Sequence, residues 1–574
     1  MTWEENYKKW LNESELNQEM KEQLKEMAGN EKELEDAFHT DLAFGTAGMR
    51  GVIAPGTNRM NPYTVRQATE GLAQFIEERG EEAKEQGVVI AYDSRHKSPE
   101  FSLEAAKTLG AHGIKTYLFE SLRSTPELSF AVRYLETSAG IMMTASHNPP
   151  EYNGYKVYGA DGGQFPPKEA DELTSYVEAV ENMLTLPVLT KEELEEKGLL
   201  EIEGEEIDQA YLDKLETVTI DRDLIERNND LSIVFSALHG TATMIASRAL
   251  ENAGFRNVHL VEEQAEPDPN FSTVQSPNPE DPKAFEYAIN LGKEIDADVL
   301  IATDPDADRL GLATPLENGE YQVLSGNQIA ALMTDYLLKA YDKDDLLSDK
   351  ATIIKSIVSS EMPTKIAEDY GVGTVDVLTG FKFIAEKIKE YEKTNEKDFL
   401  FGFEESYGYL VKAFVRDKDA IQALVLISEM VAFYKEEGKT LRDALEDLFE
   451  KHGYFKEKTI AIKMDGISGA EKIKKLMASL REQKPRSFGG LDVVVEEDYL
   501  VNTLTTKEDK TATIDLGKAN VLKYYLVDGS WIAARPSGTE PKIKFYIGAV
   551  ADSAEKVAEK IENFEKSINQ FIEG

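Results

Sequence analysis

The sequence contains no cysteine at all. Disulfide bonds, thiolate metal sites and cysteine nucleophiles are therefore excluded, and any catalysis must use oxygen and nitrogen groups. Long hydrophobic runs are missing too, because the most apolar stretch, 421–434, is short and carries Glu429. It predicts a buried or amphipathic helix and no membrane partner. The first residues, MTWEENYKKWLNES, lack the pattern of a secretory signal, so we expect a cytoplasmic protein.

Basic residues are scarce compared with acidic ones. The chain has 64 Lys and Arg against 106 Asp and Glu, a formal net charge of −42. Nucleic acid and anionic membranes bind surfaces with excess positive charge, so we expect neither as a partner. A small anionic ligand is still compatible, because exposed charges more than about 8 Å away are largely screened at physiological salt. Its site must be locally rich in arginine, lysine or metal.

The chain, at 574 residues, is longer than one hydrophobic core usually serves. Strand-like apolar runs alternate with helix-like stretches in three cycles, and each cycle ends its strands in polar, acidic or glycine-containing loops. The runs start near Val88, Ala139, Leu231, Asn257, Asp296, Ala351, Thr374 and Phe399. After about Gly453 the pattern changes to a smaller α+β segment. We therefore expect an α/β fold.

The expected fold has four domains, covering 1–206, 207–321, 322–453 and 454–574. The first three are related α/β domains with mixed sheets, and the fourth is smaller and α+β. Because ligands of such sheets bind beside the strand-end loops, we expect the active site in a central cleft between the domains.

The first chemical candidate is TASHNPP at 144–150, directly after an apolar run. Ser146 should leave a buried strand on a loop, where a serine can act as a nucleophile. A plain turn explains the same letters, because Ser, Asn and Pro all favour turns. A serine hydrolase is disfavoured, because there is no GxSxG and His147 directly follows the serine.

The second candidate is TDPDADR at 303–309, where Asp304, Asp306 and Asp308 follow a hydrophobic strand. Such oxygen ligands suit magnesium or calcium. An EF-hand is excluded, since its glycine and glutamate positions hold Arg309 and Pro315. A haloacid-dehalogenase phosphatase, with a phosphorylated Asp304, is a minor competitor because Asp308 stands where that loop needs Thr or Val.

Two further stretches complete the set. GFEESYG at 402–408 carries paired acids and a serine suited to sugar hydroxyls, although surface glutamate pairs are common in this chain. RPSGTEPKIK at 535–544 offers a planar Arg535 fork, hydroxyls and a glycine that lets backbone amides approach a phosphate. A basic loop between two strands is the plain alternative.

Taken in this order and spacing, the four stretches resemble the α-D-phosphohexomutase superfamily of serine-based phosphoglucomutases and phosphomannomutases. FGTAGMRG at 44–51, YDSR at 92–95 and TGFKFI at 379–384 extend the likeness over nearly the whole chain. Two of the four stretches, GFEESYG and RPSGTEPKIK, resemble the bacterial α-phosphoglucomutase branch most. Phe403, however, stands where many relatives have a glycine.

The resemblance implies a role for each matching residue. Ser146 would carry the phosphoryl group and bind Mg2+ together with Asp304, Asp306 and Asp308. Arg50, Lys156 and Arg309 would supply nearby positive charge, and Lys382, His147 and Lys156 are the candidates for the general acid and base. Thr379, Gly380, Glu404 and Ser406 would hold the sugar. The phosphate that is not reacting would be bound by Arg535, Ser537, Gly538, Thr539 and Lys544.

The implied reaction interconverts α-D-glucose 1-phosphate and glucose 6-phosphate through glucose 1,6-bisphosphate, which also activates the enzyme. Phosphopentomutase and phosphomannomutase activities use the same apparatus and stay open, as does a non-catalytic sugar-phosphate sensor. The expected partner is a small phosphosugar, and the expected assembly is a monomer or a weak homo-oligomer.

Overall fold

The computed structural model describes residues 2–45, 48–464, 467–537 and 542–573. The chain divides into two compact units. Unit 1 comprises residues 1–324, 385–394 and 407–436, and unit 2 comprises residues 325–384, 395–406 and 437–574. The division falls inside one helix, α17 (Phe381–Thr394), so the chain passes between the units more than once.

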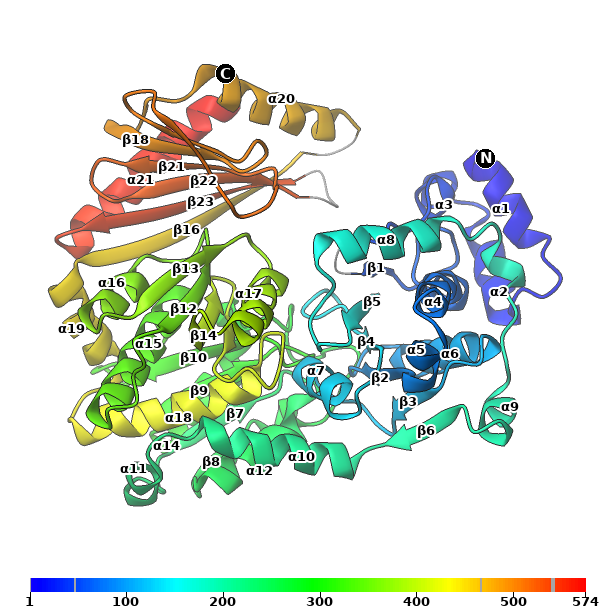
Figure 1. The fold of residues 1–574 in the computed structure, drawn as a ribbon, viewed down its shortest axis with the longest axis horizontal. Coiled ribbons are helices and arrows are strands. Elements are labelled where there is room, and N and C mark those ends of the chain that lie inside the picture. Colours follow the sequence, from blue (N-terminus) through cyan, green and yellow to red (C-terminus); the bar gives the residue numbers. More distant parts are fainter. Residues whose placement is uncertain (1, 46–47, 465–466, 538–541, 574) are drawn as a thin grey trace. The chain divides into compact units, whose positions relative to one another are not determined.

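Unit 1 begins with a small helical layer (Figure 1). Its helices are α1 (Trp3–Leu11), α2 (Gln18–Met27) and α3 (Glu31–Phe38). Each begins at a side-chain cap, because Thr2, Asn17 and Asn30 accept bonds from first-turn amides. The Trp10 ring packs edge-on against Phe38 and Tyr63, which attaches this layer to α4 (Pro62–Glu77).

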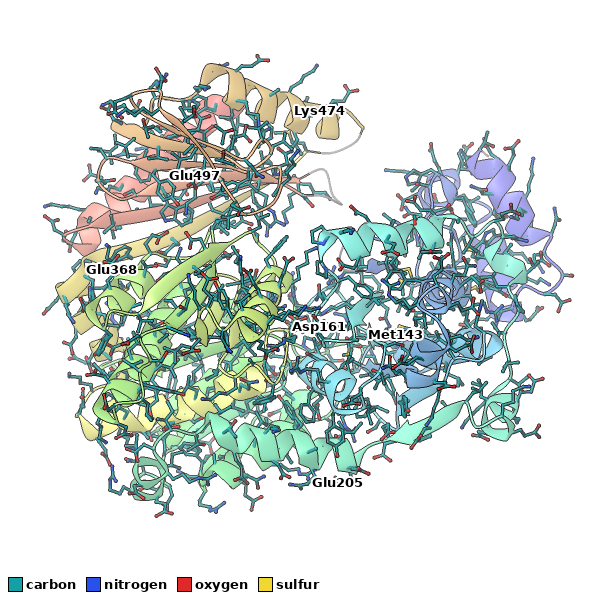
Figure 2. All side chains as sticks on the ribbon, in the orientation of Figure 1. Met143, Asp161, Glu205, Glu368, Lys474 and Glu497 are labelled. Carbon is teal, nitrogen blue, oxygen red and sulfur yellow. The ribbon has the colours of Figure 1, made fainter. Side chains whose placement is uncertain are left out.

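The first sheet of unit 1 has six strands in the order β1-β5-β4-β2-β3-β6. They are β1 (Met49–Val52), β2 (Val88–Tyr92), β3 (Thr116–Phe119), β4 (Ala139–Met143), β5 (Tyr152–Gly159) and β6 (Leu200–Glu203). β2, β3, β4 and β6 run parallel, whereas β5 pairs antiparallel with β4 and β1 pairs antiparallel with β5. Every residue of β2 and β4 is buried, down to Met143 at the end of β4 (Figure 2).

Helices pack on this sheet and build its core. Beside α4 these are α5 (Glu81–Gln86), α6 (Ser98–Ala111), α7 (Thr125–Tyr134), α8 (Pro167–Glu178) and α9 (Lys191–Glu196), with the short 3-10 helix η1 (Met183–Thr185). The alternation of strand and helix gives the parallel strands their crossovers, and the β4–β5 loop carries Ser146 out of the sheet edge.

The second sheet of unit 1 has the order β11-β10-β9-β7-β8 and repeats the first in outline. Its strands are β7 (Ile233–Ser236), β8 (Val258–Leu260), β9 (Val299–Thr303), β10 (Leu310–Pro315) and β11 (Tyr321–Val323). β7, β8 and β9 are parallel, and β10 and β11 are antiparallel additions. The β9–β10 loop carries the three aspartates.

Helical segments surround the second sheet. They are α10 (Glu205–Leu215), η2 (Glu216–Val218), α11 (Arg222–Arg227), α12 (Ala242–Ala253), α13 (Glu262–Ala265), η3 (Pro282–Phe285), α14 (Glu286–Ile295) and α18 (Ala420–Glu436). Helix α18 is buried along nearly its whole length, so the apolar run at 421–434 is a buried helix as predicted. Its Glu429 is satisfied by backbone N–H groups of Ile220 and Asp221.

Unit 2 contains three parallel strands, in the order β13-β12-β14. They are β12 (Ala351–Ser356), β13 (Gly373–Val377) and β14 (Asp398–Glu404). Helices α15 (Gly326–Lys343), α16 (Met362–Asp369) and α19 (Leu441–His452) accompany them. The short strand β15 (Gly408–Leu410) belongs to unit 1, where Gly408 forms a bridge with Arg309.

The remainder of unit 2 is an antiparallel sheet of eight strands in the order β16-β23-β22-β21-β18-β19-β20, with β17 beside β18. The strands are β16 (Tyr454–Lys463), β17 (Ser487–Phe488), β18 (Leu491–Asp498), β19 (Thr503–Thr506), β20 (Thr511–Thr513), β21 (Leu522–Leu526), β22 (Trp531–Pro536) and β23 (Lys542–Ala551). Helices α20 (Ile467–Gln483) and α21 (Ala554–Glu573) pack on it. None of the described helices is long and apolar enough to cross a membrane.

Candidate functional site

Ser146 lies in a tight loop directly beyond the buried strand β4. Its backbone is in the left-handed region, with φ 51°, and its N–H donates to Thr144 Oγ1 at 2.8 Å. The side chain is almost fully buried. Burial and a left-handed backbone are costly for a serine, so they favour a functional role over the plain surface turn.

Arg95 lies beneath this loop, and sequence reasoning assigned it no role. Its guanidinium donates to four backbone carbonyls of the loop, those of Ser146, Asn148, Pro149 and Tyr152. From the opposite side, Arg50 donates to the Asn148 side chain at 2.7 Å. The YDSR stretch, which is part of the family resemblance, was the available signal.

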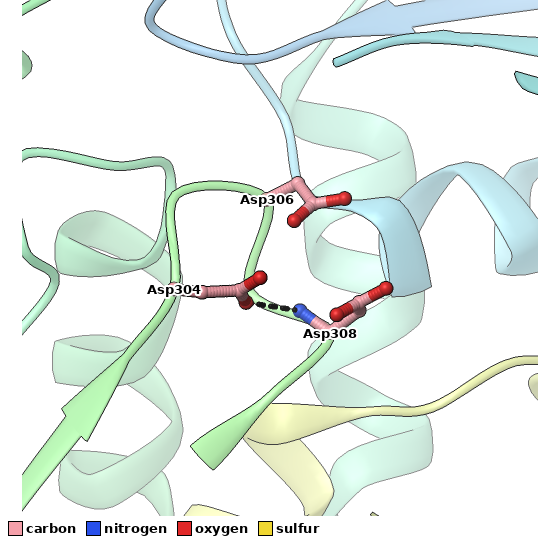
Figure 3. A group of neighbouring side chains, drawn as sticks. All are labelled: Asp304, Asp306 and Asp308. Atoms are coloured by element: carbon pink, nitrogen blue, oxygen red, sulfur yellow. Dashed lines mark hydrogen bonds between the residues drawn. The ribbon is translucent and has the colours of Figure 1, made fainter. Parts of the chain in front are cut away.

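The three aspartates meet in one buried group (Figure 3). One oxygen of each of Asp304, Asp306 and Asp308 lies within 4.8 Å of the others. The loop is tightened internally, because Asp304 Oδ1 accepts the N–H groups of Asp308 at 3.1 Å and Arg309 at 3.0 Å. Thr125, the first residue of α7, donates its hydroxyl to Asp306 Oδ2 at 2.9 Å.

Ser146 contacts this group directly. Its Oγ donates to Asp304 Oδ2 at 2.7 Å and lies 3.1 Å from His147 Nδ1. The serine comes from the first sheet and the aspartate from the second, so two strand-end loops 158 positions apart converge inside unit 1. The structure therefore brings together the first two motifs of the sequence.

The donor set fits a divalent cation such as Mg2+. Asp306 Oδ1 and Asp308 Oδ1 are buried and accept no hydrogen bond from the described residues. Burial, followed by the neighbouring Asp306 and Asp308, raises the pKa of Asp304 well above its ordinary value. Carboxylates that repel each other and leave oxygens free are stabilised by a hard cation. The buried triad is able to hold a metal.

Two lysines balance the acids. Lys156 Nζ lies 2.7 Å from Asp306 Oδ2, and Lys418 Nζ lies 3.1 Å from Asp308 Oδ2. Arg309, further along the same loop, donates to Glu280 at 2.5 Å. Sequence reasoning missed Lys418. Its signal was the dense RDKD cluster, 416–419, in an otherwise apolar stretch.

The candidate proton-transfer groups differ in their surroundings. Burial, then the charges of Arg309 and Arg50, lowers the pKa of His147 well below its ordinary value, so the imidazole is neutral near pH 7. Burial alone would lower the pKa of Lys156, but Asp306 and Asp308 outweigh it and raise that pKa. Lys156 is therefore a cation here. Lys382 begins α17 within unit 2, and its ammonium lies over the Phe383 ring.

The predicted sugar-binding residues lie together in unit 2. The N–H of Gly380 donates to Glu404 Oε1 at 2.8 Å, which joins the loop after β13 to the end of β14. Gly380 has φ 124°, a conformation that favours glycine. Thr379 Oγ1 is buried without a hydrogen-bond partner among the described residues. Ser406 is partly exposed two residues beyond Glu404.

The predicted phosphate loop is the hairpin between β22 and β23. Arg535 and Lys544 are directly opposite each other on these antiparallel strands, and the Ser537 N–H donates to Lys542 O at 2.7 Å. Directly opposed cations repel unless an anion lies between them. Gly538 and Thr539, predicted to bind the same phosphate, lie outside the described residues.

Tyr546 links this hairpin to the sugar-binding residues within unit 2. Burial, then Glu405, raises its pKa to about 12, while the nearby Arg535 acts in the opposite direction. Glu404 contributes to the same shift. Arg535 and the two glutamates are therefore close enough to Tyr546 to influence the pKa of its phenol.

The fold and the site define an α/β protein with a buried serine–carboxylate centre, and the comparisons agree. Four phosphoglucomutase/phosphomannomutase models match: α/β/α domains I, II and III at residues 41–183, 209–317 and 325–452, and the C-terminal domain at 492–565. The phosphoglucomutase of Staphylococcus haemolyticus is 42% identical over 92% of this chain and 94% of its own. The chain belongs to the phosphoglucomutase/phosphomannomutase family.

Two solved structures share the fold. Parafusin from Paramecium, a phosphoglucomutase in its open form, has a TM-score of 0.68 at 18% identity, covering 93% of this chain and 95% of that one. A phosphoglucomutase/phosphomannomutase family protein from Burkholderia thailandensis has a TM-score of 0.65 at 20% identity, covering 92% and 97%. The predicted four-domain architecture, with a smaller C-terminal domain, is confirmed. The predicted domain limits, 206, 321 and 453, stay predictions.

Proposed function

We propose that the chain interconverts α-D-glucose 1-phosphate and glucose 6-phosphate, with Ser146 as the phosphoryl carrier and glucose 1,6-bisphosphate as the intermediate. The observation that carries this proposal is the 2.7 Å bond between Ser146 Oγ and a buried aspartate of a triad able to hold a metal. The phosphoglucomutase relative, which is similar over 92% of the chain, supports glucose as the sugar.

Each transfer moves one phosphoryl group between Ser146 Oγ and a sugar hydroxyl. The attacking oxygen loses its proton as the new P–O bond forms, and the departing oxygen gains one as the old bond breaks. Neutral His147, 3.1 Å from Ser146 Oγ, is suited to exchange that proton on the serine side. Lys382 stays the candidate on the sugar side.

The cations stabilise the charge that spreads over the phosphoryl oxygens. Lys156, Lys418 and Arg309 surround the acid loop, and Arg50 lies at the serine loop. Mg2+, held by Asp304, Asp306, Asp308 and an oxygen of phosphorylated Ser146, would polarise the phosphoryl group when bound. The family likeness supports Glu404 and Ser406 as sugar ligands and Arg535, Ser537, Gly538, Thr539 and Lys544 as ligands of the second phosphate.

A mannose phosphate is the second candidate substrate, because the matching family models cover phosphomannomutases as well as phosphoglucomutases. The two sugars differ only at C2, so one apparatus can serve both. Comparing turnover on glucose 1-phosphate, mannose 1-phosphate and ribose 1-phosphate ranks them. We also propose a cytoplasmic enzyme that acts as a monomer or weak homo-oligomer.

The first test combines phosphopeptide mapping with a coupled glucose 1-phosphate assay. We expect phosphate on the Ser146 peptide, and loss of turnover by about a thousandfold or more in Ser146→Ala, because the nucleophile is removed. Ser102→Ala is the matched control. Ser102 is equally buried, and its hydroxyl makes no hydrogen bond among the described residues.

Each alternative predicts a different result. Phosphate on Asp304 would instead indicate a haloacid-dehalogenase type of phosphatase. Binding of glucose 1-phosphate without any turnover by the wild type would indicate a sensor. Full turnover in Ser146→Ala would exclude the serine as carrier.

A further inference from the structure

We propose that Arg95 is a positioning residue for phosphoryl transfer, which holds the Ser146 loop at the distance from the acid triad that transfer requires. This inference rests on the proposed function for its kinetic readout. Its structural readout, the rigidity of the loop, is independent of any activity.

Arg95 binds the loop through backbone atoms alone. Nη1 donates to Pro149 O at 2.8 Å and Tyr152 O at 3.0 Å, whereas Nη2 donates to Ser146 O at 2.5 Å and to Asn148 O. One planar guanidinium thus donates hydrogen bonds to four backbone carbonyls of the same turn. Arginine is suited to this because its donors lie in a rigid fork, whereas a lysine ammonium is a point charge on a flexible stem.

The guanidinium is itself held in place. The side chains of Arg95 and Asp93 are both fully buried, with Arg95 Nε 3.3 Å from Asp93 Oδ2. Asp93 Oδ1 accepts the Arg95 N–H and the Ser98 hydroxyl, each at 3.0 Å. The carboxylate therefore fixes the arginine, and the arginine fixes the loop. No solvent reaches either group to replace a lost bond.

Arg95 also contacts the part of unit 1 that carries the acid triad. Its guanidinium lies over the Phe271 ring, 4.9 Å from the centroid, and the adjacent His96 makes a 2.8 Å hydrogen bond with Asn270. Phe271 and Asn270 come from the stretch between α13 and η3, beside the second sheet. One side chain thus contacts both the serine loop and the layer of Asp304.

The requirement for such a clamp follows from the serine geometry. Ser146 has a left-handed backbone that a non-glycine residue adopts at a cost, and it persists only where neighbours hold it. Without the clamp, four carbonyls would lose their arginine donors, the buried one of Ser146 among them, and the loop would relax. A displacement of about 1 Å at a reacting group costs about 100-fold in rate.

The experiment uses the full-length protein with Arg95→Met, Arg95→Lys and Asp93→Asn. For Arg95→Met we expect kcat to fall by about 100-fold with KM within about threefold, because sugar binding uses other residues. Arg95→Lys should recover part of kcat. Hydrogen exchange should accelerate at the amides of Ser146, Asn148 and Tyr152, which form the internal bonds of the loop.

Arg66→Met is the control, because Arg66 is mostly buried in the same layer but pairs with Glu104 and makes no hydrogen bond or ion pair with the Ser146 loop among the described residues. It should leave kcat and loop exchange unchanged. Unchanged kcat and unchanged loop exchange in Arg95→Met would overturn the proposal. Equal losses of kcat in Arg95→Met and in the control Arg66→Met would overturn it as well. If Arg95→Met does not fold, Asp93→Asn and Arg95→Lys decide by the same readouts. A wild type without mutase activity would refute the proposed function, and loop exchange would still decide the clamp.

Discussion

Lys156 makes the burial of the acid triad possible. Its ammonium lies 2.7 Å from Asp306 and 3.6 Å from Asp308, and only 9% of its side chain is exposed. Burial of unpaired carboxylates is strongly unfavourable, and a single buried cation offsets much of that cost. The lysine and a divalent metal would therefore both compensate the charge of the same carboxylates, since Lys156 contacts their Oδ2 atoms and leaves Oδ1 of Asp306 and Asp308 without a hydrogen bond among the described residues.

We predict that Lys156→Met destabilises the metal-free protein by about 3–5 kcal/mol, because the variant removes the lysine paired with the buried Asp306. Added Mg2+ should restore more stability to the variant than to the wild type, since the metal replaces the lost charge. The first thermal unfolding transition, measured in EDTA and in Mg2+, checks both statements.

Lys435→Met is the matched control for this prediction. Lys435 also forms a 2.7 Å pair with an aspartate, Asp298, but 45% of its side chain is exposed. Such exposed pairs contribute only about 0–1 kcal/mol. An equal gain from Mg2+ in Lys156→Met and Lys435→Met would show that Lys156 does not compensate the carboxylates that hold the metal.

Some residues of the candidate site were predicted from the sequence, and others were not. That Ser146 lies beside the three aspartates was expected from the family resemblance, and the position of both motifs after buried strands agrees with it. Arg95 and Lys418 were not predicted, because their importance lies in contacts with partners 51 to 57 and 110 positions away, respectively. No local pattern reveals which buried cation faces which distant loop.

Helix α7 connects a capping motif to the acid loop. Ser124 and Glu127 form a capping box at its start, and the next residue after the cap, Thr125, donates to Asp306. Glu127 is fully buried. Burial, then the nearby Asp208, raises its pKa to about 7 from an ordinary value of 4.5.

We predict that Glu127→Gln weakens the pH dependence of stability. Because the folded pKa lies above the unfolded one, the contribution of Glu127 is fully present below about pH 4.5 and is lost as the pH rises through about 7. The wild type should therefore lose stability between about pH 5.5 and about pH 8, and the neutral glutamine should reduce that loss. Glutamine keeps the capping box.

Glu193→Gln is the control, because Glu193 occupies the same capping-box position in α9 but is exposed. It should keep the wild-type difference in unfolding temperature between the two pH values. A Glu127→Gln variant with an undiminished difference would contradict the assignment.

Helices and strands differ in how far the sequence determined them. The apolar runs near Val88, Ala139 and Asp296 correspond to β2, β4 and β9, because a short buried run bounded by polar turns has few alternatives. The edge strand β6, residues 200–203, was not predicted, and it lies in an acidic stretch just before the predicted domain limit at 206. Edge strands with exposed side chains carry little hydrophobic pattern. Pairing with β3 determines that strand.

Across the entire chain, the sequence indicated the number and class of the domains. Three cycles of strand and helix predicted the related α/β domains. The chain crosses between the two units at 324–325, 384–385, 394–395, 406–407 and 436–437, and the last four crossings were not predicted from the sequence. Residues 407–436 return to unit 1, where α18 packs against α12, because the apolar faces of both helices need a partner. Such pairing is a property of the folded chain.

The net charge of −42 leads to the last prediction. Near pH 8 the acids repel one another, so the unfolding temperature should rise by a few degrees as NaCl increases from about 10 mM to about 100 mM, which shortens the screening length from about 30 Å to about 10 Å. Exposed ion pairs are weakened by the same salt, but the excess of 106 acids over 64 bases should decide the sign. The control is the same titration near the isoelectric point, about 4.6, where the rise should shrink or vanish. A fall in unfolding temperature with salt near pH 8 would mean that exposed ion pairs outweigh the repulsion.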